Sequence, residues 1–98
     1  RLAPGLREQK EQRRADAESR KAIAKIKREK DKHVGELEMQ IASLEGRQKE
    51  LTVALEEPTA YESGGNAVAL NRELSAVSKD LERLTAAWEK ATAEAALI

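Results

Sequence analysis

A chain of 98 residues, of which 37% are charged, 2% are aromatic and none is phenylalanine, has too few bulky side chains for a globular core. This length allows one domain at most, and the composition suits a long helical coiled coil, which needs only a narrow apolar seam. The absence of cysteine excludes disulfides and thiolate metal sites, and no apolar run is long enough to cross a membrane. A cytoplasmic location is therefore the default expectation.

The net charge of zero hides a strong asymmetry along the chain. Residues 1–33 carry 12 Lys and Arg against 6 Asp and Glu, whereas residues 34–98 carry 6 against 12. Such a split indicates that the first third of the chain faces an anionic partner. Because the chain begins at Arg1 inside this basic stretch, rather than at Met, we expect it to be a piece of a longer protein.

The first predicted element is a basic arm, residues 1–21, in which Pro4 and Gly5 end the readable helix and the rest is a linker or a helical extension. Cations recur at helical spacing through the arm and beyond it. We call them the basic stripe: Arg7, Lys10, Arg14, Lys21, Lys25, Arg28 and Lys32. On a continuous helix they share one face, which points away from the apolar seam, and a second file of cations lies beside them, formed by Arg13, Arg20 and Lys27.

A row of cations on a slender rod suits a phosphate backbone, because neutralising phosphates releases counterions. The stripe therefore predicts nucleic-acid contact. No aromatic residue occurs in the arm, so stacking on bases is not expected and contacts should be insensitive to sequence. The alternative is a solvated helix face, on which interleaved glutamates act as ordinary i,i+4 partners: Glu8, Glu11, Glu18 and Glu29.

The second predicted element is a helix over about residues 22–57. Its seam follows a heptad pattern with one polar member: Val34, Leu37, Ile41, Leu44, Gln48, Leu51 and Leu55. Gln48 is interpreted as a polar residue that sets the register of the coiled coil. Upstream, Ile23, Ile26 and Lys30 extend the pattern through a stutter, which locally unwinds a supercoil.

The helix is expected to stop at a tip over residues 58–66. Pro58 disfavours helix in the residue before it, and Gly64, Gly65 and Asn66 supply a turn and a residue able to cap a new helix. Tyr61 lies within this tip. It is expected either to fold back over the end of the seam or to project as a contact residue.

The last predicted element is a helix over about residues 67–97, again with heptad spacing: Ala67, Leu70, Leu74, Val77, Leu81, Leu84, Trp88, Ala91, Ala95 and Ile98. A short tip makes the two helices antiparallel neighbours. The predicted fold is therefore all-α, an antiparallel two-helix coiled-coil hairpin over residues 22–98 with a basic N-terminal extension, in a single chain. Trp88 is expected to be a structural knob near Val34 or Leu37, and the arm has no intramolecular partner.

No catalytic residue and no metal site is predicted. His33 is the only histidine, and one imidazole without cysteine does not make a metal site. A catalytic pair of carboxylates needs an enclosed pocket to separate the two pKa values, and a two-helix rod encloses nothing. We therefore expect a binding or spacing module.

Residues 11–63 followed by residues 69–91 resemble the C-terminal coiled-coil domain of ABC-F ATPases, the Uup type especially. The basic Arg-Arg arm, the first heptad helix, the tip with Pro58 and Tyr61 and the second helix ending in Trp88-Glu89 occur in the order found there. The resemblance implies a domain appended to two ATP-binding cassettes in a non-transporting protein that acts on ribosomes, with a hairpin associated with DNA binding in Uup-like members. ATP and Mg²⁺ would then bind outside these residues, and the cassettes would be partners of the hairpin.

Two other functions agree with the residues. One is the appended coiled-coil arm of a valyl-type aminoacyl-tRNA synthetase, which contacts tRNA. The other is a spacer or oligomerisation coiled coil without any nucleic acid. The pattern of charges does not distinguish DNA, ribosomal RNA and tRNA as the target.

Overall fold

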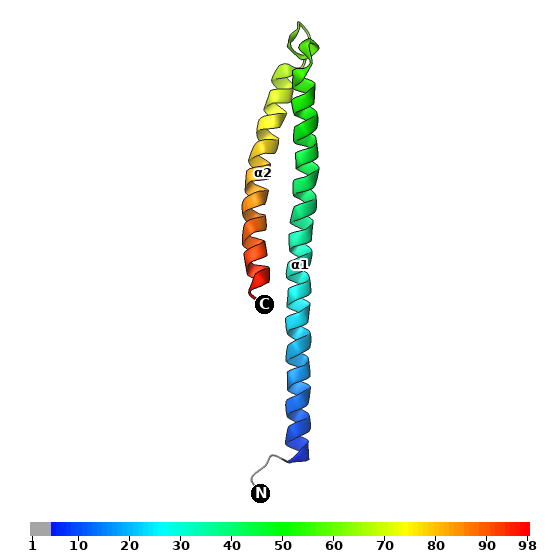
Figure 1. The fold of residues 1–98 in the computed structure, drawn as a ribbon, viewed down its shortest axis with the longest axis vertical. Coiled ribbons are helices and arrows are strands. Elements are labelled where there is room, and N and C mark those ends of the chain that lie inside the picture. Colours follow the sequence, from blue (N-terminus) through cyan, green and yellow to red (C-terminus); the bar gives the residue numbers. More distant parts are fainter. Residues whose placement is uncertain (1–4) are drawn as a thin grey trace.

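In the computed structural model, which describes residues 5–98, the chain is a rod of two antiparallel helices that measures 93 × 14 × 14 Å (Figure 1). Helix α1 spans Leu6–Glu56, the 3-10 helix η1 spans Pro58–Tyr61, and helix α2 spans Ala67–Ala96. This confirms the predicted all-α hairpin. The predicted helix stop at Pro4 lies outside the described residues. No helix in the described range is long and apolar enough to cross a membrane.

Helix α1 is one continuous element of 51 residues, so it extends about 76 Å at 1.5 Å per residue. It begins where the carbonyl oxygen of Gly5 accepts a hydrogen bond from the amide of Gln9, at 3.0 Å. The first part of α1 therefore continues the same helix that forms the hairpin, with no break near residue 21.

The tip reverses the chain through a proline and two glycines. Glu57 has the extended backbone that a residue before proline prefers, with φ −73° and ψ 125°, and Pro58 opens η1. Gly64 adopts a φ of +81°, which glycine reaches without steric cost. Gly65 packs so closely on η1 that a Cβ atom there would collide with the carbonyl oxygen of Ala60. The turn therefore needs glycine at both positions.

Asn66 precedes α2 as the spacing predicted, but its side chain makes no capping hydrogen bond. The first turn of α2 is closed through the backbone, because the carbonyl oxygen of Asn66 accepts a hydrogen bond from the amide of Leu70 at 2.9 Å. Asn66 is therefore the N-cap residue of α2, as predicted, but it caps the helix without a side-chain hydrogen bond.

The core is the narrow seam between the two helices. Its most buried members are Leu37, Leu51, Val77, Leu84, Ala91 and Ala95. Most other residues expected in the seam are partly buried, namely Val34, Ile41, Leu44, Gln48, Leu55, Ala67, Leu70, Leu74, Leu81 and Trp88. The expectation is wrong for Ile98, which follows the end of α2 and is 42% exposed. Ile26, beside the last turns of α2, and Ile23, one turn farther from them, continue the pattern and are 45% and 54% exposed. The apolar seam thus loses its cover where α2 ends.

Trp88 packs against the cluster formed by Leu37, Leu84 and Ala91, and Val34 packs against the same cluster. Its indole therefore lies where the antiparallel pairing predicts it. The indole Nε1–H is buried and has no hydrogen-bond acceptor. Trp88 thus contributes apolar area to the seam, while its polar atom remains unsatisfied.

Three polar contacts across the seam define the register of the helices. The Arg47 guanidinium donates two hydrogen bonds to the Glu73 carboxylate, at 2.7 and 2.8 Å, and the Gln48 side chain donates to the hydroxyl of Ser78 at 3.4 Å. Near the end of α2, Lys30 Nζ donates to the carbonyl oxygen of Glu94 at 3.5 Å. The seam glutamine thus bonds across the helices, as expected for a residue that sets register.

The Arg47–Glu73 pair makes stability depend on pH. The hydrogen bonds from Arg47 lower the pKa of Glu73 below its usual value of 4.5. A carboxylate with a lowered pKa in the folded state stabilises above its unfolded pKa and loses this contribution as the pH falls. We expect Glu73→Gln to lower the melting temperature at pH 6, and the difference from the wild type to shrink between pH 5 and pH 3.

Thermal melts of the two proteins across this pH range, followed by circular dichroism, measure the effect. Glu38→Gln is the matched control, because Glu38 is exposed on α1 and makes no ion pair within the described residues. A difference that stays constant with pH would contradict the role given to the Glu73 carboxylate.

Candidate nucleic-acid interface

The N-terminal part of α1 projects beyond the end of α2 (Figure 1). The last turns of α2 lie beside Ile26, Glu29, Lys30 and His33, which line a shallow hollow together with Ala91 and Glu94. Residues 6–28, which we call the arm from here on in place of the shorter range expected from the sequence, extend from this point to the start of α1. All of them are exposed except Ala17, which is partly buried. The arm is therefore a single helix with solvent on every side.

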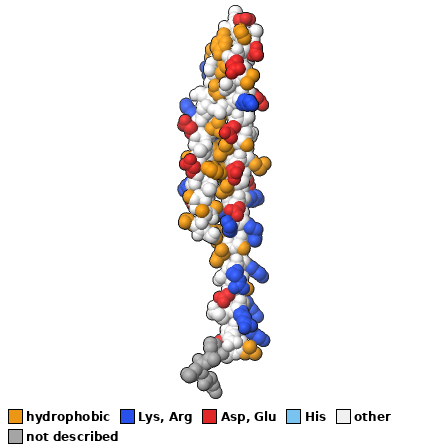
Figure 2. Space-filling model, in the orientation of Figure 1, with side chains coloured by type: hydrophobic (Ala, Val, Ile, Leu, Met, Phe, Trp, Pro, Cys, Tyr) orange, Lys and Arg blue, Asp and Glu red, His pale blue; other side chains and the backbone are white. Residues whose placement is uncertain are grey.

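The seven stripe cations are all exposed, and the helix that carries them is continuous. Because successive residues are about 100° apart around a helix, all seven lie within an arc of about 60°, roughly opposite the seam. Figure 2 shows Lys and Arg gathered on the part of α1 that extends beyond α2. The structure thus brings the stripe together on one face.

Few of these cations are neutralised by a neighbour. Among residues 5–98, the ion pairs of the basic region are Arg7–Glu11 at 3.4 Å, Lys27–Asp31 at 3.5 Å and Lys32–Glu36 at 4.0 Å, each four residues apart. Glu18 and Glu29 do not form the i,i+4 pairs with Arg14 and Lys25 that are expected on a merely solvated face. Glu8 has no cation four residues away. Lys10, Arg14, Lys21, Lys25 and Arg28 consequently have no carboxylate within ion-pair distance in the described structure.

The tip at the other end of the rod has the opposite charge. Between residues 50 and 71 the sequence holds four glutamates and no Lys or Arg. Glu62 lies in the tip, and Glu56 and Glu57 directly precede it. Tyr61 is 63% exposed, whereas its neighbour Ala60 is 6% exposed and fills the inside of the turn. Tyr61 therefore projects and does not fold over the seam. Its surroundings of carboxylates are unfavourable for phosphate.

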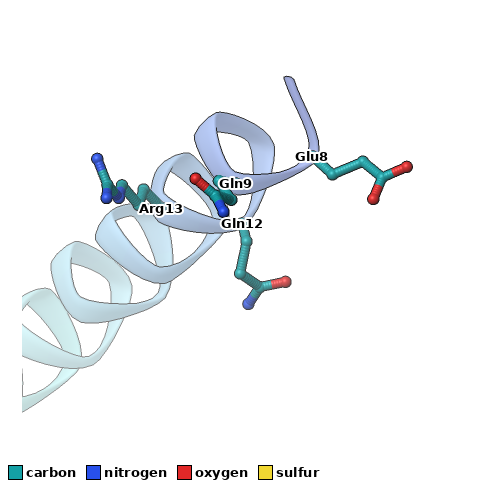
Figure 3. Close-up of a pocket in the computed structure, with 4 residues that line it drawn as sticks. All are labelled: Glu8, Gln9, Gln12 and Arg13. Carbon is teal, nitrogen blue, oxygen red and sulfur yellow. The ribbon is translucent and has the colours of Figure 1, made fainter. Parts of the chain in front are cut away.

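The surface hollows described along residues 5–98 are open to solvent. Figure 3 shows the one at the start of α1, where Glu8, Gln9, Gln12 and Arg13 extend from a single helix in different directions. The other hollows are shallow strips along one or both helices. Within residues 5–98, no three His, Cys, Asp or Glu side chains are grouped so that they could hold a metal ion.

Fold and surface together define a small helical module, an antiparallel two-helix coiled coil that carries a basic single-helix arm. The family model described as the ABC transporter C-terminal domain matches residues 7–92, which cover the tip and most of the arm and of both helices. The chain belongs to this family. No curated protein and no solved structure matches it.

Membership of this family distinguishes between two of the functions that the residues left open. It places the chain among the C-terminal domains of ABC proteins and so disfavours the arm of a valyl-type synthetase.

Proposed function

We propose that this chain is the nucleic-acid-binding C-terminal module of an ABC-F ATPase of the Uup type, and that it contacts phosphates through the basic stripe. The family match supports the coarser part of this proposal, an ABC protein's C-terminal domain. In the proposed parent protein, ATP and Mg²⁺ bind to cassettes outside this chain. The hairpin acts as a monomer beside those cassettes in the cytoplasm, and its target is DNA or ribosomal RNA.

The observation that carries the proposal is the set of unpaired cations on one face of the arm. Lys10, Arg14, Lys21, Lys25 and Arg28 are exposed, and no carboxylate lies within ion-pair distance of any of them. Three of them, Lys10, Lys21 and Arg28, have no carboxylate four residues away along the sequence, so no i,i+4 ion pair is open to them. Cations without such partners are available to neutralise phosphates and release their counterions.

The stripe also predicts the character of the binding. Lys and Arg on a helix face contact phosphates, which carry no sequence information directly. With no aromatic residue in the arm, there is no platform for stacked bases. We therefore expect binding that depends strongly on salt and hardly on sequence.

Salt titrations of the whole 98-residue chain on a fluorescent DNA duplex test this proposal. If about four phosphates are neutralised, log K falls against log salt with a slope near −3.6, at about −0.9 per phosphate. The double variant Lys25→Glu and Arg28→Glu should weaken binding to all sequences alike and flatten this slope. Glu82→Gln with Glu89→Gln, which alters exposed carboxylates on α2, is the control and should leave binding unchanged or slightly stronger.

Two results would contradict the proposal. One is an absence of binding at about 50 mM salt, where electrostatic binding is strong. The hairpin would then be a spacer coiled coil that does not bind nucleic acid. Binding that survives the charge reversal would place the contact outside the stripe.

A further inference from the structure

Basic residues occur in adjacent pairs along the arm at a strict interval of seven. The pairs are Arg13 with Arg14, Arg20 with Lys21, and Lys27 with Arg28. The second residue of each pair belongs to the stripe. The first residues form the second file, which lies about 100° away around the helix, because that is the angle between successive residues. The arm therefore carries two parallel rows of cations.

The surface between the two rows is flat. The file of residues between them contains Ala17 and Ala24, whose methyl groups do not rise above the helix backbone. Every carboxylate of residues 6–30 lies roughly 90° or more around the helix from these alanines, at 100° per residue. Asp31, the next carboxylate along the chain, pairs with Lys27 at 3.5 Å. This side of the arm thus has a row of cations along each edge, small alanine side chains between the rows, and almost no carboxylates.

The dimensions of this half match a groove between two phosphate backbones. On a helix 10–12 Å across, points about 100° apart are about 8–9 Å from one another, and extended Lys and Arg side chains widen this distance. The major groove of B-form DNA is about 12 Å wide and admits an α-helix. The three pairs span residues 13–28, about 22 Å of helix, which is less than one turn of the duplex at about 34 Å.

We propose that the arm seats in the major groove of a B-form duplex, with the alanine file toward the groove and one row of cations on each backbone. Arg13, Arg20 and Lys27 are then contact residues for the second backbone. This inference rests on the proposed function, since it assumes that the arm binds nucleic acid. A single strand offers only one line of phosphates, and the deep, narrow major groove of an A-form RNA duplex does not admit the helix.

The chain supplies a matched pair of variants that test this proposal. One is Arg13→Gln, Arg20→Gln and Lys27→Gln, and the other is Arg14→Gln, Lys21→Gln and Arg28→Gln. Both variants remove three positive charges at adjacent positions along the arm. They differ only in which of the two rows of cations loses them. Glutamine has nearly the helix propensity of Lys and Arg, and the positions are exposed, so both variants should fold. Lys79→Gln, Arg83→Gln and Lys90→Gln on α2 control for net charge.

Anisotropy titrations with a DNA duplex of about 20 base pairs, its single strand and an RNA duplex of the same sequence give the readout. With both rows on phosphates, six contacts give a wild-type slope on the DNA duplex of about −5.4, steeper than the value of about −3.6 expected for four contacts. Each arm variant should flatten this slope by about 2.7, which is 0.9 for each lost phosphate contact, and lower the affinity at least tenfold. The α2 control should bind like the wild type. On the single strand, the variant of Arg13, Arg20 and Lys27 should retain more of the slope than the stripe variant.

The outcomes separate this inference from the proposed function. If the wild type binds but the variant of Arg13, Arg20 and Lys27 binds the DNA duplex like the wild type, one row suffices and the groove seating is wrong, while the proposed function stands. Equal binding to the RNA duplex, or equal losses of slope by both variants on the single strand, would also overturn the groove seating. A wild type that binds none of the three probes would overturn the proposed function itself.

Discussion

Replacing Trp88 by alanine is expected to lower the free energy of unfolding by about 3 kcal/mol, because truncating a large seam aromatic loses transfer free energy and leaves a cavity. The indole packs against Leu37, Leu84 and Ala91, which form the buried cluster of the hairpin. For a chain of this size, such a loss lowers the melting temperature by more than about 10 °C. Thermal or urea unfolding followed by circular dichroism measures it.

The variant Trp88→Phe separates two effects of the indole on the free energy of unfolding, the packing of its ring and the burial of its N–H group. The phenyl ring keeps most of the apolar contact and removes an Nε1–H group that is buried without an acceptor. An unsatisfied buried donor costs about 1–3 kcal/mol, so its removal offsets the smaller ring. We therefore expect Trp88→Phe to lie within about 1 kcal/mol of the wild type. If Trp88→Ala left melting unchanged but abolished nucleic-acid binding, Trp88 would be a contact residue and not a structural knob.

The second large effect is expected at the tip, where Gly65→Ala should cost about 1–3 kcal/mol, the usual range for atoms forced into a packed site. The new Cβ atom would collide with the carbonyl oxygen of Ala60 and lie 2.6 Å from that of Thr59. Both are backbone atoms of η1, so no side-chain rotation can relieve the overlap and the turn itself has to shift. Urea unfolding of the variant measures the loss.

The same substitution within α1 should have the opposite sign. A Cβ atom at Gly35 or Gly46 meets nothing within 4 Å, and both residues lie in the helix interior. Because glycine costs about 0.5–1 kcal/mol relative to alanine in a helix, Gly35→Ala and Gly46→Ala should each stabilise the hairpin by about that amount. Destabilisation at all three glycines would show that the effect at Gly65 is not steric.

The periodicity of the sequence predicts most of the fold, because a two-helix rod has only one apolar stripe on each helix. The heptad spacing identifies the buried face from Val34 to Ala95, and Pro58 locates the turn. Antiparallel pairing across a short tip is sufficient to place Trp88 near Leu37. These features depend on local spacing alone.

Contacts that depend on the final register are not visible in the spacing. Arg47 and Glu73 flank the seam 26 residues apart, and their pairing follows from how many residues the tip takes up. The tip itself was predicted less well, since Ala60 and not the larger Tyr61 fills the inside of the turn. In the arm, the stripe follows from the sequence, and so does the lack of an i,i+4 carboxylate for Lys10, Lys21 and Arg28. Only the absence of the Arg14–Glu18 and Lys25–Glu29 pairs depends on side-chain conformation.

The unbroken course of α1 has a consequence for how the arm becomes helical. A helix that starts from coil has to form a costly first turn, and isolated helices shorter than about 12–15 residues are marginal in water. The arm needs no such nucleus, because its first turn is already present in the hairpin and each further residue only extends it. Its helicity is therefore coupled to the hairpin, and amide protons should exchange progressively faster from Ile26 toward Leu6. When the hairpin unfolds, the arm loses the helical turn from which it extends. The fixed spacing of the cations is then lost as well.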